Sequence, residues 1–263
     1  MESTDVNSYI PYTKADACDL VKRMTDLFAS LPTVPSKDDL CIRYRNLDGR
    51  LRILNSGCAD KYLYWASHLG YRLLDGQTAY SCDFLPDWFR KFVCSEELVI
   101  VMPSRDMDDK VHGVTVRSVF SKSFRSFTPF PYVPYGFLTS DKPYHKPWLL
   151  VESAFDSDWL RCFYPYTIAS GGVSGMNLEM LTLVSQTAPR CVVAFDNDEA
   201  GDTGYSRLNT KMKFSRKPPT VERVYSPYKK DFGDIAQLAL DNDSMYNVYK
   251  NVVLDLLHVS GLV

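Results

Sequence analysis

The stretch CVVAFDNDEAGDTG, residues 191–204, joins an apolar segment to a short acidic run and then to a helical pattern. The apolar part is typical of a strand buried on both faces, as in a parallel sheet. Asp196 and Asp198 follow it, and strand alternation places both side chains on one side. Gly201 and Gly204 then permit a tight turn into the helix. Helix capping alone also accounts for such acids, but the pattern favours a site at the end of a strand.

The same strand–helix order extends over residues 146–240. Predicted strands cover residues 147–152, 167–170, 190–196 and 220–226. Predicted helices cover residues 156–164, 174–187, 199–213 and 232–240, with Asp156 as the N-cap of the first. This alternation predicts an α/β domain in which a parallel sheet is flanked by crossover helices.

The chain before residue 146 has a different pattern and predicts a mixed α+β subdomain. Periodicity indicates a helix over residues 13–29, and alternation around Asp48-Gly49 indicates a hairpin over residues 40–55. Two further strands are predicted at 97–102 and 112–120, followed by a proline-rich loop.

Four segments follow from these patterns. They are an N-terminal α+β region at 1–95, a strand pair with a basic loop at 96–145, the α/β domain at 146–240 and a C-terminal helix at 241–263. The final helix presents Val248, Val252, Leu256 and Val259 on one face, with which it either docks back or recruits a partner.

Acidic residues follow three of the predicted parallel strands. Glu152 ends the first strand, Asp196 and Asp198 end the third, and Asp231 and Asp234 follow the fourth. Because clustered carboxylates repel one another, a divalent cation is the usual means of stabilising them. Hard oxygen ligands favour Mg²⁺ or Mn²⁺, and a set of this size suits two ions.

Composition excludes several classes of protein. The formal net charge of −2 excludes a uniformly basic surface, and no apolar run approaches the length of a membrane span. Seven widely spaced cysteines without a CxxC pair, and four scattered histidines, argue for reduced thiols and against a zinc site. With its polar, acidic first residues, the sequence is expected to be cytoplasmic.

The runs LLVESAFD (149–156), VVAFDNDEAG (192–201) and KKDFGD (229–234) resemble the motifs of the Toprim domain. That family includes primases, topoisomerases and some nucleases, and the resemblance implies that Glu152, Asp196 and Asp198 are catalytic. It also implies that these three bind metal together with Asp231 and Asp234. Ser153 stands where the family often has glycine, and Lys230-Asp231-Phe232-Gly233-Asp234 departs from the usual last motif.

Residues 98–120 resemble the strand pair that precedes Toprim in bacterial and phage primases. Met102-Pro103, Asp106, Gly113 and Arg117 match that signature, although the glycines beside the arginine are absent. Tyr135-Gly136-Phe137 is similar to the segment that leads into the domain. The zinc-binding segment of full-length primases and the GxxxxGK[ST] motif of a fused helicase are not present in this sequence.

The basic residues agree with a nucleic-acid ligand. Residues 110–146 contain six Lys and Arg against one acid, and eight Phe and Tyr lie among them. Cations neutralise phosphates and aromatic rings stack on unpaired bases, although a solvated basic face has the same composition. We expect Arg117, Lys122, Arg125 and Lys230 to contact the template or the nucleotide.

We therefore expect a DNA primase that makes short RNA primers on single-stranded DNA by Mg²⁺-dependent nucleotidyl transfer. The expected partners are a single-stranded template, nucleoside triphosphates and a separate replicative helicase, in phage or plasmid replication within the host cytoplasm. A Toprim nuclease using the same metal, and a non-catalytic nucleic-acid-binding replication protein, remain alternatives.

Overall fold

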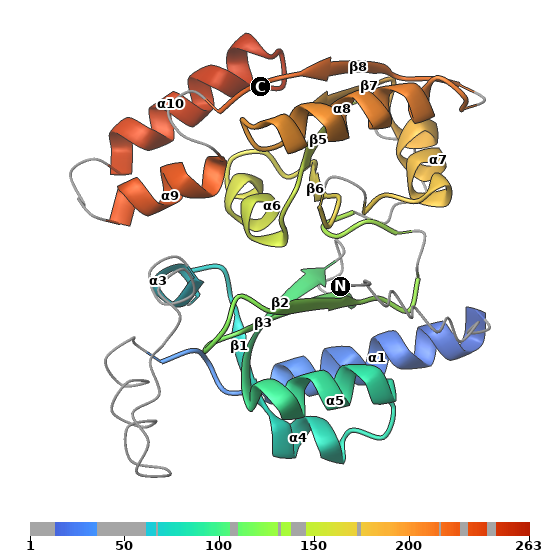
Figure 1. Ribbon diagram of the computed structural model, residues 1–263, viewed down its shortest axis with the longest axis vertical. Coiled ribbons are helices and arrows are strands. Elements are labelled where there is room, and N and C mark those ends of the chain that lie inside the picture. Colours follow the sequence, from blue (N-terminus) through green and yellow to red (C-terminus); the bar gives the residue numbers. More distant parts are fainter. Residues whose placement is uncertain are drawn as a thin grey trace.

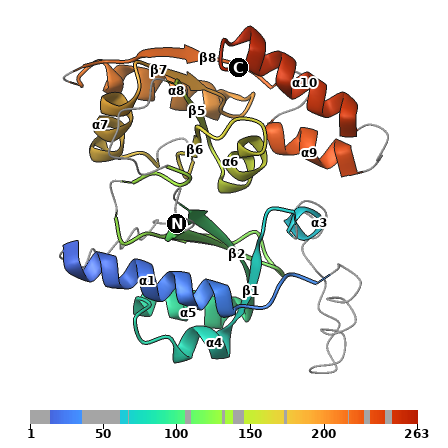
Figure 2. The ribbon, with the colours of Figure 1, turned by 180° about the vertical axis from the view of Figure 1, so that it is seen from behind.

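The structure is a computed structural model, and it describes residues 14–35, 62–66, 68–105, 110–130, 133–137, 146–172, 175–215, 217–226, 231–240 and 246–263. The predicted hairpin at 40–55, Asp106 and Lys230 lie outside these residues. Two domains lie one above the other in Figures 1 and 2, an N-terminal domain up to residue 137 and a C-terminal domain from residue 146.

The N-terminal domain is built on an antiparallel sheet of order β1-β2-β3-β4. Its strands are β1 (Arg72–Asp75), β2 (Leu98–Arg105), β3 (Val111–Ser118) and β4 (Phe124–Phe127). The described helices of this domain are α1 (Lys14–Ser30), α3 (Leu63–Trp65), α4 (Gly76–Ser81) and α5 (Asp87–Glu96). The helix predicted at 13–29 and the strands predicted at 97–102 and 112–120 are thereby confirmed.

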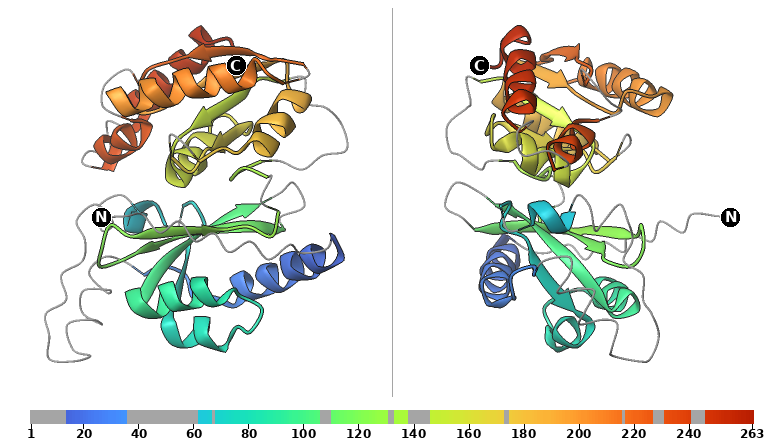
Figure 3. Two further views of the ribbon diagram at one scale, coloured as in Figure 1. Left: turned by 45° about the vertical axis from the view of Figure 1, so that its right-hand side comes forward. Right: turned by 90° about the vertical axis from the view of Figure 1, so that its left-hand side faces the viewer.

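Alternation along β2 divides the sheet between two cores. Val99 and Val101 belong to the core under α1 and α5, whereas Ile100 and Met102 belong to the core shared with the C-terminal domain. Figures 1 and 3 show α1, α4 and α5 on the face of the sheet away from the C-terminal domain. The boundary expected at residue 95 falls inside this unit, because β1 pairs along its length with β2.

The C-terminal domain contains the predicted parallel sheet, with strand order β6-β5-β7-β8. Its strands are β5 (Trp148–Val151), β6 (Thr167–Ala169), β7 (Arg190–Val193) and β8 (Thr220–Arg223). Its described helices are α6 (Ala154–Arg161), α7 (Leu178–Thr187), α8 (Glu199–Met212), α9 (Phe232–Leu240) and α10 (Tyr246–Val259). The predicted fold class is confirmed.

The strand order creates a switch point between β5 and β7. The chain passes from β5 outward to β6 and then returns to the other side of β5 to form β7. Loops that leave adjacent strands in opposite directions open a crevice at the carboxyl edge, where α/β sheets bind ligands. Glu152 and Asp196 lie in the loops that follow β5 and β7, the two strands that flank this crevice.

The C-terminal helix docks on its own domain, with a different face from the one predicted. Val253, Leu257 and Leu262 are buried, whereas Val248 and Val259 are exposed. Arg190 donates to the carbonyl of Ser260 at 2.6 Å, which ties the end of the chain to the start of β7. No described helix is both long and apolar enough to span a membrane.

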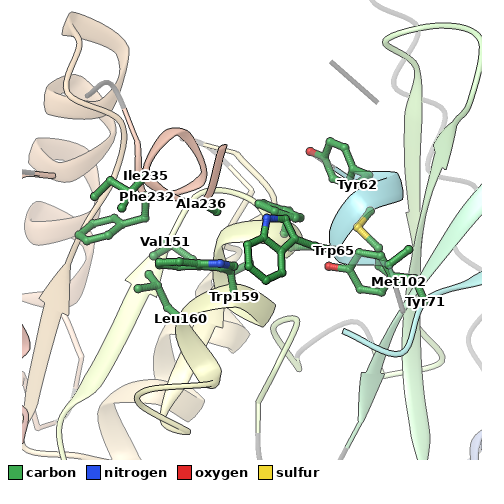
Figure 4. Packing of buried hydrophobic residues seen from close by; sticks show 14 of the residues in the cluster. Tyr62, Trp65, Tyr71, Met102, Val151, Trp159, Leu160, Phe232, Ile235 and Ala236 are labelled. Atoms are coloured by element: carbon green, nitrogen blue, oxygen red, sulfur yellow. The ribbon is translucent and has the colours of Figure 1, made fainter. Parts of the chain in front are cut away.

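An apolar core joins the two domains. Figure 4 shows Tyr62, Trp65 and Met102 of the N-terminal domain on one side of the junction and Trp159 of α6 on the other. All four side chains are buried in one cluster that also contains Phe232 of α9. Burial of each large aromatic ring stabilises the folded protein by several kcal/mol. The junction therefore holds the two domains in a fixed arrangement.

A largely buried carboxylate adds a polar link to this junction. The hydroxyls of Tyr71 and Tyr135 donate to Asp158 Oδ2 at 2.9 and 2.6 Å. The backbone N–H of Gly136 donates to Ser104 Oγ at 2.8 Å. Burial raises the pKa of the Asp158 carboxyl from 3.8 to about 6, even though the two tyrosine hydrogen bonds act to lower it.

The raised pKa predicts a pH-dependent stability. The folded protein holds the Asp158 proton up to about pH 6 whereas the unfolded chain loses it near pH 3.8, so stability falls as pH rises through this window. Asp158→Asn keeps an acceptor for both hydroxyls and should stabilise the protein at pH 8 by up to about 3 kcal/mol. Urea unfolding from pH 4 to pH 8 measures this difference, which should vanish near pH 4. Asp255→Asn on α10 controls for the loss of one charge. The prediction would be contradicted if the free energy of unfolding changed with pH equally in the wild type and in Asp158→Asn.

Candidate active site at the carboxyl edge of the parallel sheet

Glu152 reaches across the switch point to the loop after β7. Its Oε1 accepts a hydrogen bond from the backbone N–H of Asp196 at 3.0 Å. Its own carbonyl accepts from the N–H groups of Gly171 and Gly172, both at 3.0 Å. The first residue of the β5–α6 loop is therefore fixed from the loops of both neighbouring strands, and its carboxylate lies against the acidic segment.

The two aspartates of the DxD sequence occupy different structural positions. β7 ends at Val193, so Asp196 belongs to a loop, and the predicted strand up to residue 196 is too long by three residues. Asp198 is the N-cap of α8, and its Oδ1 accepts from the N–H of Gly201 at 2.9 Å. Strand alternation is thus not the reason for their proximity. A loop closed by an Asp198 N–H bond to the Asp196 carbonyl, at 2.9 Å, holds them together.

The predicted N-cap of α6 is wrong by three residues. Ser153 is the cap, because its Oγ accepts from the N–H of Asp156 at 3.1 Å. The same hydroxyl donates to Asp156 Oδ2 at 2.7 Å. Serine in the position that follows Glu152 therefore starts the helix directly after the acidic residue.

Asn197, between the two aspartates, connects them to the last acidic segment. Its Nδ2 donates to the carbonyl of Ser226 at 2.8 Å, and its Oδ1 accepts from the Ser226 N–H at 3.1 Å. Ser226 Oγ donates to the carbonyl of Asp231 at 3.3 Å, and Asp231 Oδ1 accepts from the N–H of Asp234 at 2.6 Å. The side chain of Asn197 thus continues the pairing of β7 with β8 beyond the strand ends.

We expect Asn197→Ala to destabilise the protein by about 1–3 kcal/mol, because it leaves both backbone groups of the buried Ser226 without their partner. Asn197→Asp keeps the acceptor and loses the donor, so it should lie between the wild type and the alanine variant. Urea unfolding measures both, and an unchanged free energy of unfolding for Asn197→Ala would contradict the role of this bridge.

Arg223, at the end of β8, is a positioning residue that sequence reasoning missed. Its guanidinium donates to the carbonyls of Phe195 and Asp196, both at 2.8 Å, and pairs with Asp202 at 3.3 Å. Its side chain is only 6% exposed. Arg223 therefore orients the backbone of the acidic loop, and its pairing partners are set by the tertiary fold rather than by a local pattern.

The sheet separates the basic residues that the sequence groups together. Arg117 pairs with Ile100 in the β2–β3 ladder and so lies on the face toward the C-terminal domain, where its guanidinium stacks on Tyr62 at 4.5 Å. Arg125 pairs with Val116 and lies on the opposite face, over Phe92 of α5 at 5.2 Å. Lys122 is exposed in the connection between β3 and β4.

The donor chemistry of the acidic edge fits a hard dication. Glu152, Asp196 and Asp198 supply carboxylate oxygens and are each partly open to solvent. Among the described residues, however, no group of three or more His, Cys, Asp or Glu lies in an arrangement that could hold a metal. Glu152 and Asp198 instead accept bonds from backbone N–H groups, which stabilises their charges where they stand.

Residues 149–236, which include Glu152, Asp196 and Asp198, match the model of the Toprim-like family. No curated protein sequence matches the chain.

The fold is similar to that of primase catalytic cores. A DnaG primase catalytic domain bound to single-stranded DNA is 14% identical with a TM-score of 0.52, and the match covers 94% of this chain and 84% of that one. A primase domain from Pseudomonas aeruginosa is 14% identical with a TM-score of 0.53, over 83% and 74% of the two chains. The Aquifex aeolicus primase, with zinc-binding and RNA polymerase domains, is 13% identical with a TM-score of 0.53, over 93% of this chain and 62% of that one. These similarities extend over both domains.

Proposed function

We propose that the protein is a DNA primase that synthesises short RNA primers on single-stranded DNA. The observation that carries the proposal is the acidic edge itself. Hydrogen bonds from the side chains of Glu152 and Asn197 to the backbone join three loops at the switch point of a Toprim-like domain, and the N-terminal domain completes a fold similar to primase catalytic cores. A separate helicase would open the duplex, in phage or plasmid replication.

The acidic edge would hold Mg²⁺ or Mn²⁺ through Glu152, Asp196 and Asp198, with Asp231 and Asp234 as further ligands. When bound, such an ion neutralises phosphate charge and lowers the pKa of an attacking hydroxyl. The hydrogen bonds of Glu152 and Arg223 keep the backbone of Asp196 in place, so few groups need to reorganise when the nucleotide binds.

The face of the N-terminal sheet toward the C-terminal domain supplies groups that suit a single strand. Arg117 and Phe124 are directly opposite each other in the β3–β4 ladder, so their side chains lie on the same face. Phe124 is 48% exposed. A cation beside an exposed ring binds phosphate and base together. We propose that the template strand passes over these residues and Lys122, and Lys230 stays a predicted contact of the nucleotide.

A primer-synthesis assay tests the proposal. The protein is incubated with single-stranded DNA of mixed sequence, labelled nucleoside triphosphates and Mg²⁺, and the products are resolved by length. Template-dependent short RNA that is absent with EDTA supports primase activity. Shortened DNA without nucleotides would show a nuclease instead, and DNA binding without either product would show a non-catalytic protein. Both of these outcomes overturn the proposal.

A further inference from the structure

We propose that Tyr225 is the stacking platform for the base of the nucleoside triphosphate, a subsite that deepens the proposed function. Tyr225 follows β8 and lines an open groove of about 740 Å³ along the first half of α8. Asn197 and Asp198 line the same groove, so a ligand that lies in it touches the acidic edge. The volume suits a ligand of nucleotide size.

The ring of Tyr225 is exposed and yet held in position. The residue is 53% exposed, and one face of its ring is covered by the guanidinium of Arg223, 4.6 Å from the ring centroid. Its hydroxyl donates to Asp202 Oδ1 at 3.4 Å. A large aromatic surface that stays in water while its orientation is fixed loses little conformational entropy when a ligand stacks on it. This is the arrangement expected of a base-stacking residue.

Arg223 connects the platform to the acidic loop. The guanidinium that stacks on Tyr225 also donates to the carbonyl of Asp196 and is almost fully buried. The position of the ring and the position of the acidic loop are therefore set by one side chain. A ligand whose phosphates lie at Asp196 and Asp198 would find the ring at a fixed offset.

The charge of the groove selects a nucleotide rather than a strand. Among the residues that line it, Asp198, Glu199 and Asp202 outnumber the cation Arg207. Such a lining repels the phosphates of a continuous backbone, which single-strand channels bind through rows of cations. The divalent cation that accompanies a triphosphate neutralises part of the phosphate charge and can itself be bound by the carboxylates of the groove. The favoured occupant is thus a single nucleoside triphosphate with its cation.

The test compares Tyr225→Leu with Tyr225→Phe, which keeps the ring and loses only the hydroxyl. Calorimetry in the presence of Mn²⁺ measures the dissociation constants of ATP, GTP and inorganic tripolyphosphate, and fluorescence anisotropy measures that of a single-stranded oligonucleotide. We expect Tyr225→Leu to weaken both nucleotides by about tenfold or more. Tyr225→Phe should remain within about twofold, and neither variant should change tripolyphosphate or oligonucleotide binding. Because the side chain is half-exposed, both variants should fold.

Three results would overturn the inference. They are unchanged nucleotide affinity in Tyr225→Leu, an equal loss for nucleotide and tripolyphosphate, and a loss confined to the oligonucleotide. The outcome is separable from that of the primase proposal. If the wild-type protein binds nucleotides through Tyr225 but makes no primers, the primase proposal fails and the subsite is retained. If the protein makes primers and Tyr225→Leu binds nucleotides as the wild type does, only the subsite is refuted.

Discussion

Replacing Asp196 with asparagine is expected to abolish primer synthesis while leaving the fold intact. Changing a group that only supports a metal ligand typically costs 10–100-fold in activity, so loss of a direct ligand should cost about 10³-fold or more. Stability should be unchanged or slightly higher, because one of several neighbouring negative charges is removed. The rate of template-dependent RNA synthesis and the urea unfolding midpoint, measured on the same preparation, check both halves.

Asp198→Asn tests the acidic edge without disturbing the helix. Asparagine is as good an N-cap as aspartate, so the bond from the Gly201 N–H to residue 198 is kept and only the charge is lost. The matched control is Glu179→Gln, which removes an exposed acid from the first turn of α7. Full activity and full Mn²⁺ affinity in Asp196→Asn and Asp198→Asn would refute the proposed metal site.

Gly201→Ala is expected to lower the free energy of unfolding by about 3 kcal/mol or more and to remove activity. A Cβ at Gly201 would lie 2.1 Å from the carbonyl oxygen of Asp196, which Arg223 and the Asp198 N–H hold from other sides. Since the obstacle is backbone, either α8 or the acidic loop must move. Urea unfolding and the primer-synthesis assay give the two measurements.

The sign of this effect is itself informative. Gly201 lies in the first turn of α8, where helix propensity alone predicts that alanine stabilises by up to about 1 kcal/mol. Gly70→Ala, with φ of +70° and no atom within 4 Å of the added Cβ, serves as the control. It should cost about 1–2 kcal/mol from backbone strain and leave activity unchanged. A stabilised Gly201→Ala would show that the acidic loop does not approach α8 closely.

This contact also corrects the reason for the glycine. The sequence suggests that Gly201 permits a tight turn, but the residue is helical, and what excludes a side chain is the approach of the Asp196 carbonyl. Ser153 and Asp198 were likewise not identified as the N-caps of α6 and α8 from the sequence, because a cap can be assigned only when the first residue of the helix is known. Local patterns locate an element to within a few residues, and a cap depends on the exact boundary.

The parallel sheet and its acidic edge could be predicted from the chain alone. Strand–helix alternation over 146–240 leaves few topologies, because crossovers between parallel strands are right-handed and keep the carboxyl ends together. Glu152 and Asp196 therefore had to lie on one edge, and the structure places them in hydrogen-bond contact. Predicting the fold needed no knowledge of side-chain packing.

Only the tertiary structure decided which polar and charged side chains lie together. Arg117 and Arg125 are eight residues apart and yet lie on opposite faces, because strand pairing rather than sequence spacing sets the face. Arg223, Tyr225 and the Asn197 bridge gain their roles from partners that are 21 to 29 residues away. Periodicity records which face of an element is apolar, whereas the positions of polar side chains depend on long-range contacts that form only when the sheet closes.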